Sequence, residues 1–221
     1  RIKPATISGV QNIVSKFNAI GNERQFAFFQ EDGRLKLQLS EETGDSTPAT
    51  YTVDGFDDYS VSLNGTDEYI SMGDVGQAEG IAQLSVAFWI NFNSISASQE
   101  LITKGEYADG SASWGIQYDH VNKRLSISVS NSIYVYIVYE FIPGQWYHIT
   151  WAYSNTSDYF AIYINGAAQT IDSWFINNGT FIDIPTTAKA LKIGHGDGNL
   201  FGNFKIKQVG IWADYLSANE I

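Results

Sequence analysis

The stretch Leu125-Ser126-Ile127-Ser128-Val129-Ser130 alternates apolar side chains with serines from end to end. Successive side chains of a β-strand point to opposite faces of its sheet. Leu125, Ile127 and Val129 therefore share one face, and the three serines share the other. A strand of this kind has one face in a core and the other in water. We predict such a strand here, and the fold prediction fails if those three apolar side chains face solvent.

The same alternation recurs along the chain, whereas sustained helical periodicity does not. In residues 84–92, every second side chain is apolar, which predicts another strand with one buried face. Asn165-Gly166 stands between two such runs and is a strong hairpin signal. The alternation slips by one residue between Ile206 and Val209, which predicts a β-bulge. Together these patterns predict an all-β chain of antiparallel strands.

An internal repeat links two parts of the chain. Residues 11–40 resemble residues 99–130, with apolar positions matching apolar ones and Phe26 falling on Trp114. Such a repeat indicates two copies of one β-rich module, before any local propensity is considered. The second copy is nearly complete, whereas the first is only a piece.

The boundary between the two copies falls in the polar, turn-rich stretch 41–50. We therefore expect a partial repeat or β extension at 1–50 and a complete module at 51–221. The chain opens at Arg1 and stops within what reads as the start of a helix, so we also expect a piece of a longer protein.

Composition limits the partners. The 221 residues carry 24 acidic and 13 basic side chains, which give a net charge of −11 and argue against nucleic acid as a partner. Cysteine is absent, so no disulfide and no cysteine-based zinc site is expected, and a bacterial or phage source is favoured over a eukaryotic secreted one. No segment approaches the ~18 consecutive apolar residues of a membrane span.

Several blocks, in a fixed order, carry a resemblance to a known family. They lie at 59–70, 84–92 with 101–105, 144–151, 162–166, and 191–194 with 201–221. In this order they resemble laminin-G-like domains of the concanavalin A-like lectin/glucanase and pentraxin superfamily, of the style seen in phage and bacterial surface proteins. The resemblance implies an antiparallel two-sheet jelly-roll sandwich. One departure is that Lys207-Gln208 stands where the family usually has an acidic pair.

The same jelly roll also carries glycoside hydrolases, which need two closely spaced carboxylates. On one strand such a pair reads Glu-x-Asp-x-x-Glu, and no run of this form exists here. Glu41-Glu42 and Asp57-Asp58 are adjacent pairs, and within a strand their members would face opposite sides. His120, His148 and His195 show no metal-ligand spacing. We predict that the chain is not an enzyme.

The resemblance implies one candidate metal site, for Ca²⁺ at the rim of a sheet. Its candidate ligands are Asp74, Asp197 and Asn199, since hard cations require several oxygen ligands. The alternative is that these acidic loops are simply solvated.

Glycan binding requires an exposed aromatic ring beside amide or carboxylate groups. Trp174, Phe175 and Asn177 offer this combination in one short segment, and His195 lies in a glycine-rich polar loop. These four residues are the candidate carbohydrate site. The alternatives are core packing for the tryptophan and a plain turn for the histidine.

The leading functional hypothesis is a non-enzymatic structural or adhesion protein, a fibre or decoration of a virion or cell surface, that binds glycans or neighbouring surface proteins. The runner-up is a carbohydrate-binding module of a larger secreted bacterial enzyme, and a third reading is a ligand-free structural spacer. The expected location is a virion surface or the extracellular space. Self-association into a homo-oligomer is left open.

Overall fold

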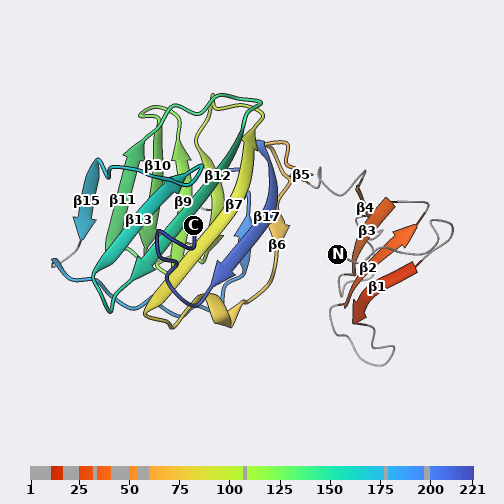
Figure 1. The fold of residues 1–221 in the computed structure, drawn as a ribbon, viewed down its shortest axis with the longest axis horizontal. Coiled ribbons are helices and arrows are strands. Elements are labelled where there is room, and N and C mark those ends of the chain that lie inside the picture. The colour runs from red at the N-terminus through yellow and green to blue at the C-terminus, as the bar shows by residue number, and fades with distance from the viewer. Residues whose placement is uncertain are drawn as a thin grey trace. The chain divides into compact units, whose positions relative to one another are not determined.

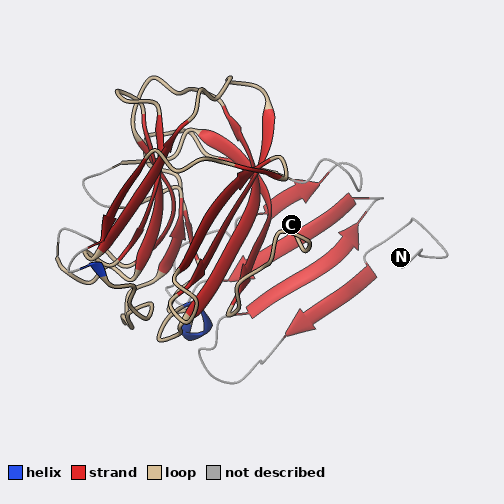
Figure 2. Ribbon diagram, turned by 60° about the vertical axis from the view of Figure 1, so that its left-hand side comes forward, coloured by secondary structure: helices blue, strands red, loops and turns tan. Residues whose placement is uncertain are grey.

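The computed structural model describes residues 60–106, 109–176, 179–196 and 200–221, together with the backbone of four strands between residues 11 and 53. The chain forms two compact units, residues 1–61 and residues 62–221. The regular secondary structure described in the second unit consists almost entirely of strands, which form two sheets, as Figures 1 and 2 show. The all-β prediction is confirmed.

The seven-stranded sheet has the order β15-β11-β10-β9-β8-β16-β6, and the six-stranded sheet has the order β14-β13-β12-β7-β17-β5. All strand pairings within these sheets are antiparallel where the pairing is given. The elements of this unit are β5 (Val61–Ser62), β6 (Ile70–Ser71), a 3-10 turn η1 (Gly76–Ala78), β7 (Gln83–Phe92), β8 (Gln99–Lys104), β9 (Trp114–Asp119), β10 (Arg124–Val129), β11 (Ile133–Val138), β12 (Trp146–Ser154), β13 (Tyr159–Ile164), β14 (Ala167–Ala168), β15 (Ser173–Ile176), β16 (Leu191–Ile193) and β17 (Phe204–Trp212).

The hydrophobic core lies between the two sheets. Leu125, Ile127 and Val129 of β10 are fully buried, as their alternation predicts. Aromatic rings join the layers, and the centroids of Trp114 on β9 and Trp151 on β12 lie 5.6 Å apart. The predicted apolar face of β7 is also completely buried, and it consists of Leu84, Val86, Phe88, Ile90 and Phe92. The two-layer sandwich follows from these alternating faces.

Local features predicted from sequence appear where expected. Asn165 and Gly166 both have positive φ, at 53° and 76°, and join β13 to β14 in a tight hairpin. The register of β17 against β7 shifts between Lys207 and Gly210, which is the predicted bulge. Near the chain end, the carboxylate of Glu220 accepts hydrogen bonds from the backbone and hydroxyl of Ser217 at 2.9 and 2.7 Å, but the segment forms a turn rather than a helix.

The strands described in the first unit form a four-stranded antiparallel sheet. Its strands are β1 (Gln11–Lys16), β2 (Gln25–Glu31), β3 (Arg34–Ser40) and β4 (Thr50–Val53), in sequential order. The predicted module boundary falls within 41–50, and these residues lie outside the described ones apart from Thr50. Thr50 belongs to β4, which pairs with β3.

The strand pairing in the first unit follows that of the repeat partner. Lys16 pairs with Phe26 as Lys104 pairs with Trp114. The register shift between Asn12 and Val14 also falls at the position equivalent to the shift in β8 between Glu100 and Ile102. The three strands β1–β3 therefore have the register of β8–β10.

Candidate functional site

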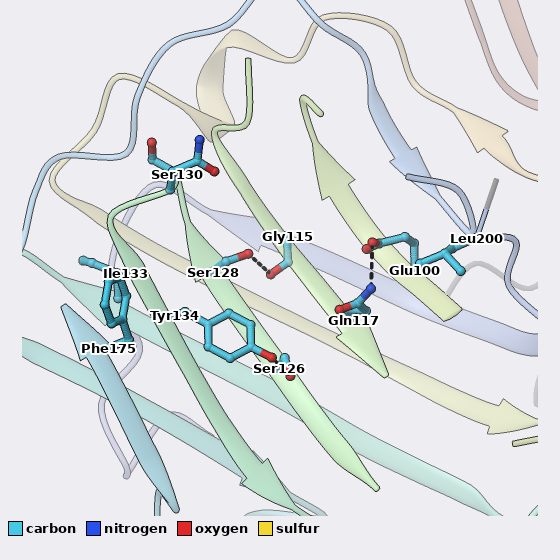
Figure 3. A pocket seen from close by; sticks show the side chains of 11 residues that line it. Glu100, Gly115, Gln117, Ser126, Ser128, Ser130, Ile133, Tyr134, Phe175 and Leu200 are labelled. Atoms are coloured by element: carbon cyan, nitrogen blue, oxygen red, sulfur yellow. Dashed lines mark hydrogen bonds between the residues drawn. The ribbon is translucent and has the colours of Figure 1, made fainter. Parts of the chain in front are cut away.

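A hollow of about 410 Å³ lies on the outer face of the seven-stranded sheet (Figure 3). It crosses five elements, because its lining comes from β8, β9, β10, β11 and β15 and from two loops. The lining residues are Glu100, Gly115, Gln117, Ser126, Ser128, Ser130, Asn131, Ile133, Tyr134, Phe175 and Leu200. Serines of the alternating stretch 125–130 thus form part of its floor.

The aromatic wall of the hollow results from the pairing of β11 with β15. Tyr134 pairs with Phe175 in this antiparallel register, so both side chains lie on the outer face of the sheet. Phe175 is 57% exposed and Tyr134 is 37% exposed. The Tyr134 hydroxyl lies 2.7 Å from the Ser126 hydroxyl, which fixes the phenol ring across the floor. The ring of Phe175 has no comparable polar anchor and presents a purely apolar surface.

The floor of the hollow is polar and lined by small side chains. Gly115 and Ser128 are opposite each other on β9 and β10, and the Ser128 hydroxyl donates to the Gly115 carbonyl oxygen at 3.4 Å. At the far side, the Gln117 amide donates to the Glu100 carboxylate at 3.2 Å. Glu100 is only 5% exposed. Small side chains keep the floor open, while the amide and the carboxylate supply hydrogen-bonding groups along it.

Leu200 lines the other end of the hollow, where Figure 3 shows it opposite Phe175. Gly196, after β16, packs tightly on β8, because a Cβ atom added to it would lie 2.4 Å from Cγ of Glu100. The candidate His195 is not among the described lining residues of the hollow. Its ring packs between Tyr69 and Phe201, with centroids at 4.9 and 4.6 Å.

The other carbohydrate candidates are divided by the alternation of β15. Trp174 pairs with Val135, which is fully buried, so its side chain lies on the core side of the sheet, opposite to Phe175. Its ring packs edge-on against Phe160, with a centroid distance of 5.5 Å, although 45% of the residue remains exposed. Phe175 therefore lines the hollow and Trp174 does not lie on its described lining. Asn177 lies outside the described residues.

The candidate metal ligand Asp74 contacts a cation of the protein itself. The ammonium group of Lys104, which is fully buried, lies 2.6 Å from Asp74 and 3.2 Å from Glu79. It also donates to the carbonyl oxygens of Thr187, at 3.2 Å, and Lys189, at 2.5 Å. One lysine thus occupies a cage of oxygen atoms of the kind that a hard cation prefers.

The other two candidate calcium ligands, Asp197 and Asn199, lie outside the described residues. Within the described part of the chain, no three His, Cys, Asp or Glu side chains gather as a metal site. Calcium at this rim therefore stays a prediction.

A family model decides the classification. The model of the Laminin_G_3 family, described as the concanavalin A-like lectin/glucanases superfamily, matches residues 64–221. The chain belongs to this superfamily. The resemblance read from the sequence blocks is confirmed, and so is the jelly-roll sandwich. No curated protein matches the chain by sequence.

Several solved structures resemble the chain in fold. The heptameric SAP-like pentraxin of Limulus polyphemus has a TM-score of 0.56 at 17% identity, covering 72% of this chain and 77% of the pentraxin chain. The CBM40 module of the Ruminococcus gnavus IT-sialidase has a TM-score of 0.56 at 13% identity, with 73% and 95% coverage. A NanB sialidase mutant from Streptococcus pneumoniae has a TM-score of 0.56 at 9% identity, but the match covers only 27% of that chain and 73% of this one. These likenesses establish the fold.

Most of the hollow was missed by sequence reasoning. Glu100, Gln117, Ser126 and Ser128 are polar residues on the outer face of three strands that follow one another in the sheet. The period-two spacing of the serines is visible in the sequence, but a strand face of serines indicates first of all a face in contact with water. The signal that could have identified them is a polar face shared by consecutive strands next to a strand that carries aromatic residues.

Among the described residues, no helix is long and apolar enough to cross a membrane.

Proposed function

We propose that residues 62–221 bind glycans in the hollow on the seven-stranded sheet, without catalysis. The observation that carries this proposal is the combination found there: the exposed ring of Phe175 and the amide and carboxylate of Gln117 and Glu100 lie around one floor of small side chains. A sugar ring has an apolar face of C–H groups and an edge of hydroxyls. An aromatic ring suits the face, and fixed hydrogen-bonding groups suit the edge.

The ligand we propose is a neutral glycan. Among the described lining residues, Glu100 is the one charged side chain, and it is acidic. A carboxylated sugar would place like charges together in a partly buried hollow, which disfavours binding. A structural neighbour, the CBM40 module of Ruminococcus gnavus, has been crystallised with α2,3 sialyllactose. That neighbour supports glycan binding by this fold, while the lining here favours a different sugar class.

The absence of catalysis in this proposal rests on the carboxylates. Glycoside hydrolysis requires an acid and a second carboxylate on opposite sides of the scissile bond. Of the lining residues that the structure describes, Glu100 alone carries a carboxylate, and it accepts a hydrogen bond from Gln117. The geometry therefore supports holding a sugar more than cleaving it.

At the level of the whole chain we propose an adhesion or decoration role at a virion or cell surface, outside the cytoplasm. The repeated style of the sequence and the low content of charged residues, 17%, support this role. We also propose that the first unit is a partial repeat of the second, supported by the shared register of β1–β3 and β8–β10. A carbohydrate-binding module of a larger secreted enzyme would use the same hollow. The two roles are therefore distinguished by whether the chain occurs in a surface protein or in an enzyme.

A pair of neighbouring aromatic residues tests the glycan site. We expect Phe175→Ala to weaken binding of the best ligand from a glycan array at least ~10-fold, which corresponds to about 1.4 kcal/mol of lost ring contact. Trp174→Ala is the matched control, since its ring lies on the other face of β15 and its loss leaves affinity within about twofold. Titration calorimetry with and without a calcium chelator measures both variants.

Two outcomes of this experiment would contradict the proposal. Unchanged affinity in Phe175→Ala with lost affinity in Trp174→Ala would place the sugar on the other face of β15. If no glycan on the array binds the chain, with or without calcium, the hypothesis of a ligand-free structural spacer is favoured instead. Mass spectrometry that locates the intact chain in a virion or a secretome separates the surface role from the enzyme-module role.

A further inference from the structure

A second hollow, of about 670 Å³, lies on the outer face of the six-stranded sheet, on the opposite side of the sandwich from the glycan site. Its lining residues are Trp89, Trp146, His148, Asn165, Gly166 and Ile221. Its volume is within the range of about 300–1,000 Å³ typical of small-ligand sites. Two of its residues are tryptophans that face outward, away from the core.

The two tryptophans lie on adjacent strands and are held in position by charged or aromatic neighbours. His148 of β12 pairs with Trp89 of β7, and their ring centroids lie 5.1 Å apart. Lys207 of β17 pairs with Trp89 from the other side and places its ammonium group 4.5 Å from the ring centroid of Trp146. Both indoles are partly exposed. Because neighbours on both sides position them, the surface is largely formed before any ligand arrives.

Polar groups stand at one edge of this aromatic surface. The backbone amide of His148 donates to the side-chain oxygen of Asn165 at 2.9 Å, and the backbone amide of Asn165 donates to the His148 carbonyl oxygen at 2.8 Å. With its oxygen held in this way, the Asn165 side chain offers its NH₂ group at the rim. Burial lowers the pKa of His148, so its imidazole is neutral at neutral pH and can both donate and accept a hydrogen bond.

Core packing does not account for these outward-facing rings. Trp114 and Trp151 are fully buried between the sheets, whereas Trp89 and Trp146 are on the solvent side of their strands. The chain end crosses the same outer face, where the backbone amide of Leu216 donates to the Ser85 hydroxyl at 2.8 Å (Figure 1). Beside this segment, the residues Trp89 and Trp146 are partly exposed. Large aromatic surface that remains open beside fixed polar groups marks a binding site.

From this arrangement we infer a second carbohydrate site, which takes a pyranose ring against Trp89 and Trp146 with its hydroxyls toward Asn165 and His148. The apolar C–H face of a pyranose suits the indole surface, and its hydroxyl edge suits the amide and imidazole groups. The inference goes beyond the proposed function and does not depend on it, because no lining residue is shared between the two hollows. Two sites on opposite sheets would let one module bind two glycan chains.

Indole N–H signals in NMR spectra of the full chain provide a direct test. The chain has six tryptophans, and Trp→Phe substitutions assign their signals. The titration uses the Phe175→Ala variant, in which the first site is disabled, with methyl galactoside, methyl glucoside, N-acetylglucosamine and N-acetylneuraminic acid as probes. We expect at least one probe to give saturable shifts at Trp89 and Trp146. The second hollow itself is unchanged in the titrated protein, and its Trp→Phe variants serve only to assign the signals of Trp89 and Trp146.

Trp212 is the matched control for this titration. It is 42% exposed, belongs to the same sheet, and does not line the hollow. Its signal should not move, and Trp212→Phe should bind as the parent does. Trp146→Gln should reduce affinity at least tenfold.

Three results would overturn the inference. The first is that no probe gives a saturable shift at Trp89 or Trp146. The second is that the Trp212 signal shifts equally. The third is that the shifts occur in the unmodified chain but vanish in Phe175→Ala. In contrast, shifts at Trp89 and Trp146 in a protein whose first hollow binds no glycan would refute the proposed function and leave this second site standing.

Discussion

The side chain of Lys104 is fully buried, and oxygen atoms of four residues surround its ammonium group. Burying a charge without partners costs much folding free energy. Removing one member of a buried ion pair therefore destabilises the fold, because the other charge stays buried without compensation. Here Glu79 is also nearly buried, with 8% of its side chain exposed, so removal of the lysine would strand a carboxylate in the interior. The interaction with Asp74 contributes less, since half of that side chain is in solvent.

We predict that Lys104→Met lowers the free energy of unfolding by about 3–5 kcal/mol, the cost typical of breaking a buried ion pair. Denaturant unfolding followed by tryptophan fluorescence measures the change. Lys123→Met is the control, because Lys123 pairs with Glu140 on the surface and exposed pairs contribute about 0–1 kcal/mol. Equal losses in both variants would show that the buried cage does not stabilise the fold.

Single residues also show what the sequence could and could not predict about the site. Phe175 was predicted as a candidate because an aromatic ring beside polar residues is visible in the sequence. Its neighbour Trp174 was predicted with equal reason, yet one step along a strand moves a side chain to the other face. Which face is which depends on pairing with β11, and this pairing joins residues about forty positions apart. The same applies to Glu100 and Gln117, which are brought together only by the register of β8 and β9.

At the scale of elements, glycines after strands show how turns and packing act together. Gly194 follows β16 with a φ of 79°, and a Cβ atom there would lie 2.2 Å from Cδ1 of the buried Leu63. Gly166 in the β13–β14 hairpin has a similar φ of 76°, but no atom lies within 4 Å of an added Cβ. The two positions share the same backbone requirement and differ in the space around them.

We predict that Gly166→Ala destabilises the fold by about 1–2 kcal/mol, the cost of a left-handed conformation for a residue with a Cβ. Gly194→Ala adds overpacking against Leu63 at about 1–3 kcal/mol, for a total of about 2–5 kcal/mol. Thermal or denaturant unfolding of the two variants separates these contributions. If Gly166→Ala proved as damaging as Gly194→Ala, the close approach to Leu63 would not be the cause.

The elements themselves were largely predictable, because strands with one buried face leave a period-two pattern. That pattern predicts β7 and β10, and its slip predicts the bulge in β17. It could not locate β15 as an edge strand beside β11, since only four residues pair and the two strands are distant in sequence. The aromatic wall of the first hollow depends on this pairing. The fold could therefore be predicted from the sequence, whereas this part of the candidate site could not.

At the scale of the whole molecule, the core and both hollows belong to one unit. All described residues that line either hollow lie within residues 62–221. The core between the sheets is likewise formed by this unit, whose outermost short strand β5 begins at Val61. The strands described in the first unit are β1–β4. In the repeat, the positions equivalent to Gln117 and Ser126 are occupied by Phe29 and Lys36. The groups that form the floor of the first hollow are therefore not repeated there.

We predict that a truncated chain of residues 60–221 folds by itself and binds the same glycans as the full chain. Its unfolding midpoint should lie within a few degrees of that of the second unit in the full chain, because the truncation removes no described residue of the sandwich core. Differential scanning calorimetry compares the midpoints, and titration calorimetry compares the affinities. A midpoint lowered by ten degrees or more, or a lost affinity, would instead mean that the first unit supports the second, and that the site is a property of both.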